Sequence, residues 1–137
     1  MSELKLVEII YSLSDKCTAH RKKHLKELGL LKAEFKGLIC MDKERKITCK
    51  DFAQRMGLSL SRVSRIIDSL YKKNYILRID SRSDRRCKMI YLTQKGKYAQ
   101  NQIERIMEQC EQKLTSDMAD DKLNPMKRDL LDLIQKL

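Results

Sequence analysis

The hydrophobic period of the chain changes from helical to strand-like after residue 74 and becomes helical again after residue 93. Residues 76–80 and 88–92 are two short apolar runs, and the link 81–86 between them is polar and basic. Such a pair of runs predicts a β-hairpin within an otherwise helical chain. The scarcity of chain-breaking residues agrees with this, because the 137 residues include one proline and four glycines.

Long helices are expected on both sides of this hairpin. Residues 3–27 carry a stripe with a coiled-coil-like spacing of about 3.5, formed by Leu6, Ile10, Leu13, Cys17, His20 and His24. A shorter helix is expected over 32–41, and a long one from Gln94 to about Leu114. An acidic loop over 115–123 then leads to a last helix, which we expect to start at Asn124–Pro125 because these residue types are typical of the cap and the first helical position.

Between the first helices and the hairpin, the sequence predicts two more helices joined by a short turn. Thr48 is a suitable cap for the first of them, Asp51 lies where its charge suits the exposed amides, and Gly57 ends the helix. Ser59 caps the second, which reaches Asn74. Two helices with a brief glycine-bearing turn between them form a helix-turn-helix, and a hairpin directly after it is a wing.

The net charge of +11 is concentrated in this central part of the chain. Residues 43–97 hold 16 Lys and Arg but only 5 Asp and Glu, whereas the remaining residues are balanced in charge. A localised basic block indicates a face that binds nucleic acid. The alternative is a solvated surface with a chance asymmetry of charge.

The polar face of helix 59–74 is suited to the major groove of DNA. An arginine there can donate two parallel hydrogen bonds to a guanine edge, and short serine side chains let the backbone approach closely. The candidate contacts on this helix are Ser59, Ser61, Arg62, Ser64, Arg65 and Ser69. The alternative is an amphipathic helix whose polar face is merely solvated.

The tip of the wing carries three arginines, Arg82, Arg85 and Arg86, with Asp84 among them. Three guanidinium groups on an exposed turn repel one another unless an anionic partner is present, and a narrow minor groove supplies one. We read Asp84 as an orienting partner for an arginine. The alternative is a charged turn that keeps the hairpin soluble.

Taken together, these motifs resemble the MarR family of bacterial and archaeal regulators. The resemblance covers about residues 28–97 and is carried by Leu28-Gly29-Leu30, Ile47-Thr48, Gly57-Leu58-Ser59, residues 63–70, Asp84-Arg85-Arg86 and Leu92-Thr93-Gln94-Lys95-Gly96. The family usually has glycine after the second helix of the pair, where this chain has Asn74. Asparagine also tolerates the left-handed conformation.

The resemblance implies a mainly α (α+β) fold, a winged helix-turn-helix with a two-stranded β wing. Helix 59–74 would be the recognition helix, and Arg85 or Arg86 the arginine in the minor groove. Helices 3–27, 98–114 and 125–137 would interlock with a second copy. We therefore expect one domain over 1–137, with a DNA-binding lobe over 30–97 and a helical dimerisation region formed by 1–29 and 98–137.

The implied function is that of a homodimeric, sequence-specific DNA-binding transcription regulator. It would be a repressor that a small ligand or a stress signal releases from double-stranded DNA. The alternatives are a sensor that responds to metal or thiol oxidation, and a winged helix that binds protein or RNA. Whether the chain represses or activates stays open. We expect no enzymatic activity, because the sequence has no glycine-rich phosphate loop, no nucleophile elbow and no pair of carboxylates in apolar surroundings.

Cys17, His20 and His24 share one face of the first predicted helix, and their spacing would let two of them bind one metal. The alternative, that small soft residues fill a helix interface, leads us to expect no metal and no other cofactor. The five cysteines are odd in number and form no CxxC pair, so we expect no disulfide framework.

No apolar run approaches the roughly 18 residues that a membrane-spanning helix needs, and Glu3 and Lys5 interrupt the N-terminal segment. We therefore expect a cytoplasmic protein without a membrane partner.

Overall fold

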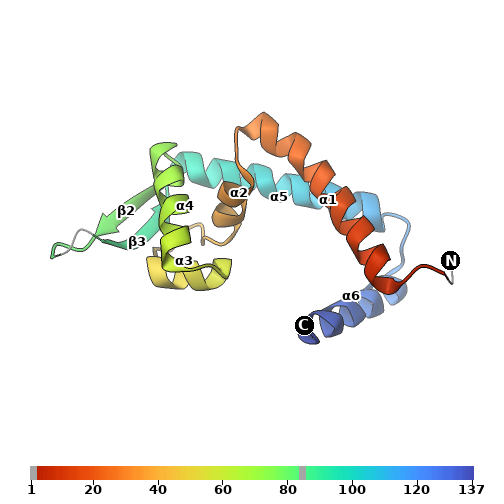
Figure 1. Ribbon diagram of the computed structural model, residues 1–137. Coiled ribbons are helices and arrows are strands. Elements are labelled where there is room, and N and C mark those ends of the chain that lie inside the picture. Colours follow the sequence, from red (N-terminus) through yellow and green to blue (C-terminus); the bar gives the residue numbers. More distant parts are fainter. Residues whose placement is uncertain (1–2, 84–85) are drawn as a thin grey trace. The chain divides into compact units, whose positions relative to one another are not determined.

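The computed structural model describes residues 3–83 and 86–137. Figure 1 shows a mostly helical chain with one small antiparallel sheet. The elements in chain order are α1 (Leu6–Leu28), α2 (Lys32–Ile39), β1 (Ile47–Thr48), α3 (Cys49–Met56), α4 (Leu60–Lys72), β2 (Ile76–Asp80), β3 (Cys87–Leu92), α5 (Gln94–Thr115) and α6 (Asp120–Gln135). The contacts divide the chain into two compact units, Met1–Ile106 and Met107–Leu137.

The local signals for the helix-turn-helix are confirmed. The Thr48 hydroxyl accepts a hydrogen bond of 3.0 Å from the amide of Asp51, and the Ser59 hydroxyl accepts one of 3.3 Å from the amide of Arg62. Gly57 ends α3 with a φ of 68°, a left-handed conformation that glycine adopts without a steric penalty. Asn74 also has a positive φ, 65°, so the chain leaves α4 in the conformation expected of it.

The sheet has one strand more than the two expected. Its order is β1-β3-β2, and both neighbouring pairs are antiparallel. In the short β1, Ile47 pairs with Ile90 and Thr48 with Met89. This strand joins the start of α3 to the hairpin, and with only two residues it is too short to show a period in the sequence.

The core of the first unit combines the helix-turn-helix, the sheet, α2 and the first part of α5. Its most deeply buried large side chains are Leu38, Phe52, Ile67, Leu70, Ile76, Ile90 and Ile103. Because α4 contributes one apolar face to this core, its other face is left for solvent or a ligand. The winged helix-turn-helix predicted from the sequence is thus confirmed.

The start of the last helix differs from the prediction. The helix α6 begins at Asp120, not at Asn124, and Pro125 lies inside it. Asp120 and Asp121 occupy its first turn, where negative charge is favourable next to the exposed amides. An Asn-Pro pair is equally typical of a helix start, which is why the sequence pattern placed the start too late.

Candidate nucleic-acid interface

The N-terminal half of α4 presents a polar, basic surface. Ser59, Ser61, Arg62, Ser64 and Arg65 are exposed. On the opposite face of the helix, Val63, Ile67 and Leu70 are at most 2 % exposed. The guanidinium groups of the two arginines make no ion pair or hydrogen bond with another residue that the structure describes. Two cations without a partner among residues 3–83 and 86–137, next to the N-terminus of the same helix, form a surface suited to a polyanion.

Ser69, the remaining candidate on this helix, is half-buried and turned toward α2. Its hydroxyl donates a hydrogen bond to a carboxylate oxygen of Glu34. Glu34 is itself only 1 % exposed, and its other oxygen accepts hydrogen bonds from the Lys73 ammonium at 2.7 Å and from the Leu31 amide at 2.8 Å. The carboxylate thus ties the C-terminal half of α4 to the start of α2. Glu34 was not singled out from the sequence.

Burial alone would raise the pKa of Glu34, but hydrogen bonds from Lys73, Ser69 and Leu31, together with the Lys73 charge, lower it below its ordinary value of 4.5. Folding therefore favours the ionised carboxylate. This contribution to stability is complete above pH 4.5 and is lost as the pH falls through the lowered pKa of the folded chain.

We expect the Glu34→Ala variant to lose about 2 kcal/mol of unfolding free energy, because it leaves polar groups between α2 and α4 without their acceptor. Glu34→Gln should lose less and should also flatten the acid dependence of stability. Urea unfolding at several pH values measures both effects. The control is Glu44→Gln, at an exposed ion pair with Lys97, for which a change within about 0.5 kcal/mol is expected. Equal stability of the Glu34→Ala variant and the parent at neutral pH would show that this carboxylate does not hold α4.

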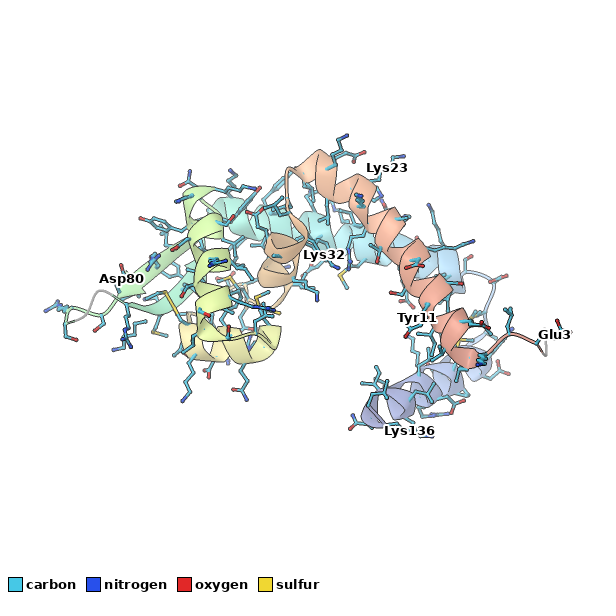
Figure 2. The ribbon with its side chains drawn as sticks, viewed as in Figure 1. Glu3, Tyr11, Lys23, Lys32, Asp80 and Lys136 are labelled. Carbon is cyan, nitrogen blue, oxygen red and sulfur yellow. A yellow bond between two sulfur atoms is a disulfide. The ribbon has the colours of Figure 1, made fainter. Side chains whose placement is uncertain are left out.

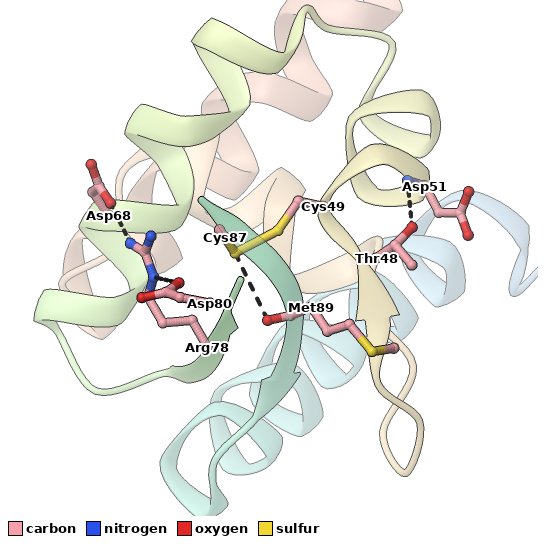
Figure 3. The surroundings of a disulfide bond; sticks show 8 residues. All are labelled: Thr48, Cys49, Asp51, Asp68, Arg78, Asp80, Cys87 and Met89. Atoms are coloured by element: carbon pink, nitrogen blue, oxygen red, sulfur yellow. Dashed lines mark hydrogen bonds and ion pairs between the residues drawn. A yellow bond between two sulfur atoms is a disulfide. The ribbon is translucent and has the colours of Figure 1, made fainter. Parts of the chain in front are cut away.

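The wing is joined to α4 through Arg78 on β2 (Figure 3). Its Nε donates to Oδ1 of Asp80 at 2.9 Å, and its Nη1 donates to Oδ1 of Asp68 at 2.8 Å. The bond to Asp80, followed by the bond to Asp68, raises the pKa of Arg78 against the opposing effect of burial. One side chain therefore fixes β2 and α4 in one arrangement.

Of the predicted wing contacts, Arg82 and Arg86 are exposed. Asp84 and Arg85 lie outside the described residues. The amide of Ser81 donates a 2.7 Å hydrogen bond to the carbonyl of Arg86 and so closes the hairpin near its tip. Between α4 and the wing is a cavity of about 430 Å³. It is lined by Cys49, Leu60, Ser61, Val63, Ser64, Ile67, Asp68, Arg78, Arg86 and Cys87.

Cys49 and Cys87 form a disulfide bond, with their Cα atoms 6.4 Å apart (Figure 3). The two residues are 38 positions apart and belong to different elements, so no spacing motif marks them. The expectation that the cysteines form no disulfide framework missed this single pair, which depends on β1 pairing with β3.

The histidines of α1 lie close together, with ring centroids of His20 and His24 at 5.1 Å, and Cys17 on the same helix is exposed. Among residues 3–83 and 86–137, no three His, Cys, Asp or Glu side chains are grouped so that they could hold a metal ion. Across those same residues, no helix is both long and apolar enough to cross a membrane.

Fold and surface together define a winged helix-turn-helix protein. The family model for the MarR family matches residues 30–88. The transcriptional repressor MprA of Escherichia coli K12 is 31 % identical over 96 residues, which cover 69 % of this chain and 54 % of MprA. The HTH-type transcriptional regulator SarZ of Staphylococcus epidermidis is 32 % identical over 78 residues, which cover 57 % of this chain and 53 % of SarZ. The chain thus spans about half the length of these curated relatives, and its residues 30–88 match the MarR family.

Solved structures with the same fold span nearly the whole chain. The MepR–DNA complex of Staphylococcus aureus has a TM-score of 0.82 at 21 % identity and covers 98 % of this chain and 100 % of MepR. The reduced form of MarR from E. coli has a TM-score of 0.74 at 22 % identity, and the match covers 95 % of this chain and 96 % of MarR. MprA and SarZ are named as transcriptional regulators and not as enzymes, which confirms the expectation of a non-enzymatic protein at the level of the family.

Proposed function

We propose that the chain is a sequence-specific DNA-binding transcription regulator that acts as a homodimer. The observation that carries the proposal is the exposed face of α4, where Arg62 and Arg65 have no partner among the described residues and the arginine-bearing wing follows. Arg62 and Arg65, with Ser59, Ser61 and Ser64, would enter the major groove, and Arg82, Arg85 and Arg86 would follow the minor groove. Ser69 would not contact DNA in this proposal. Its hydroxyl donates to Glu34 and so helps to hold α4 against α2.

In this proposal, residues 30–97 form the DNA-binding lobe, and residues 1–29 and 98–137 form the dimerisation region. Large apolar side chains are exposed on α1 and α6, and contact with a second copy of the chain would bury them. They are Leu6, Val7, Ile10, Tyr11 and Leu13 on α1, and Met126, Leu130, Leu131 and Ile134 on α6; Tyr11 is labelled in Figure 2.

Repression and release by a small ligand are the finer parts of the proposal. MprA, one of the relatives, is named as a transcriptional repressor. A cavity of about 590 Å³ lies where α1 ends and α2 begins. Its lining includes the basic residues Arg21, Lys22, Lys26 and Lys32 and the leucines Leu25, Leu30 and Leu31. A small anionic ligand with an apolar body would fit this lining. Such a regulator would act in the cytoplasm, where the DNA is.

A salt titration tests the proposed DNA contacts. If several Lys and Arg neutralise phosphates, log affinity for a duplex should fall linearly with log salt, with a slope of about −0.9 for each contact. We expect a slope several times this value for the parent chain and a slope lower by about one for Arg86→Ala. Binding that ignores salt, or no binding in dilute buffer, would refute the proposal.

A further inference from the structure

We propose that Cys49 and Cys87 are a reversible dithiol–disulfide pair that controls DNA affinity by fixing the wing to the helix-turn-helix. The DNA part of this proposal rests on the function proposed above; the thiol chemistry does not. The two cysteines connect α3, the first helix of the pair, with β3, the second strand of the wing.

The disulfide lies at the end of the strand pairing, on the side of the wing tip. Thr48 is the last residue of β1 and pairs with Met89, and Cys49 follows it directly. Cys87 pairs with Asp80, the last residue of β2, so it marks the end of the hairpin ladder before the arginine-bearing tip. The disulfide therefore extends a two-residue strand pairing toward the tip. Its Cα–Cα distance of 6.4 Å lies within the range of disulfides in general.

With the bond in place, both strands of the wing are anchored near the tip. Strand β2 is held to α4 by the Arg78–Asp68 ion pair, and β3 is held to α3 by the two sulfurs. Reduction would remove the covalent link on that side and leave β3 with its two residue pairs to β1 and the packing of Ile90 and Leu92 in the core, both of which lie farther from the tip. The tip would then gain freedom, and ordering it on DNA would cost more. Oxidised chain should accordingly bind DNA more tightly than reduced chain.

The surroundings suit exchange in both directions. Both cysteines line the 430 Å³ cavity beside α4, so a small thiol can reach the bond. Cys87 is half-buried, whereas Cys49 is only 8 % exposed, and we therefore assign the attacked sulfur to Cys87. Cys49 is the first residue of α3, where exposed amides favour a departing thiolate. The Sγ of Cys87 also lies 3.8 Å from the carbonyl oxygen of Met89, an acceptor for its S–H once reduced.

The oxidant is a low-molecular-weight disulfide of the glutathione type. The thiolate of Cys87 attacks it, which forms a mixed disulfide and releases one thiol. The thiolate of Cys49 then attacks the Cys87 sulfur, which forms the internal bond and releases the second thiol. Two protein thiols thus lose two protons and two electrons, and one small disulfide becomes two thiols. An excess of thiol reverses both steps. In a compartment that keeps thiols reduced, such a bond would form only when the small-thiol pool becomes more oxidised.

The test compares the full-length parent with two variants across glutathione buffers of different ratio. Cys49→Ser/Cys87→Ser removes the pair, and Cys17→Ser/Cys40→Ser/Cys110→Ser keeps it as the only source of a disulfide. Mass spectrometry after thiol alkylation measures the internal bond, hydrogen exchange measures the amides of residues 76–92, and a duplex titration measures affinity. In the triple variant we expect a reversible two-electron transition, slower exchange near the wing tip when oxidised, and about tenfold tighter DNA binding.

The double serine variant should show none of these changes. If the bond does not form, or forms without any change in exchange or affinity, the proposal is overturned, and tighter binding by the reduced chain also overturns it. If oxidation alters the exchange but neither redox state binds duplex DNA, the link to DNA and the proposed function fail together, whereas the thiol chemistry stands.

Discussion

Replacing Arg62 and Arg65 together by alanine is expected to weaken binding to the preferred duplex by about 30-fold or more. Each two-pronged contact of an arginine with a guanine edge is worth about 1–3 kcal/mol of discrimination, and every factor of ten in affinity is about 1.4 kcal/mol. Both guanidinium groups are exposed on α4, so their removal leaves none of the described residues without a hydrogen-bond or ion-pair partner. Fold stability should stay near that of the parent.

The loss should be larger for the preferred duplex than for random DNA, because base contacts carry sequence preference and phosphate contacts do not. The matched control is Arg105→Ala/Arg128→Ala, which removes the same charge from α5 and α6. It removes the same formal charge of two but touches no proposed base contact. Competition titrations with preferred and random duplexes measure both effects. If the two double variants lost affinity to the same extent, α4 would not be the element that reads the sequence.

Gly96→Ala is expected to lose about 3 kcal/mol or more of unfolding free energy. A Cβ at this position would overlap the backbone carbonyl oxygen of Tyr75 and would lie 3.0 Å from Cδ2 of Leu92. That carbonyl also accepts hydrogen bonds of 3.1 Å from both the amide and the hydroxyl of Thr93. Because the obstacle is backbone, relief requires moving the chain segment that leads into β2, and these bonds would be disturbed.

Urea unfolding of the variant, the parent and a control measures this loss. The control is Gln94→Ala at the exposed start of the same helix, for which a change within about 0.5 kcal/mol is expected. A Gly96→Ala chain with the parent's midpoint would mean that α5 and Tyr75 do not approach as closely as described. The presence of glycine at position 96, in Leu92-Thr93-Gln94-Lys95-Gly96, would then need another explanation.

What the sequence predicted correctly is mostly local. Thr48 and Ser59 cap their helices and Gly57 ends α3, because these signals act over three or four residues. The hairpin was found because two apolar runs flank a polar link. The exposed arginines of α4 followed from the helical period, which assigns Val63, Ile67 and Leu70 to the core.

What it missed depends on residues that are distant along the chain. Glu34 reads as one more acidic residue at a helix start, and only the contact with Ser69, 35 positions away, shows its role. Cys49 and Cys87 meet because two residues of β1 add to the hairpin. Pro125 misled for the opposite reason, since a strong local signal was overridden by the acidic turn before it.

Selection of preferred duplexes from a random pool tests the central claim most directly. A homodimer that inserts two copies of α4 should enrich near-palindromes whose half-sites lie about 10 base pairs apart, or a multiple of that helical turn, with two chains bound to each duplex. A pool that gains no common sequence, or a single asymmetric site bound by one chain, would contradict the account.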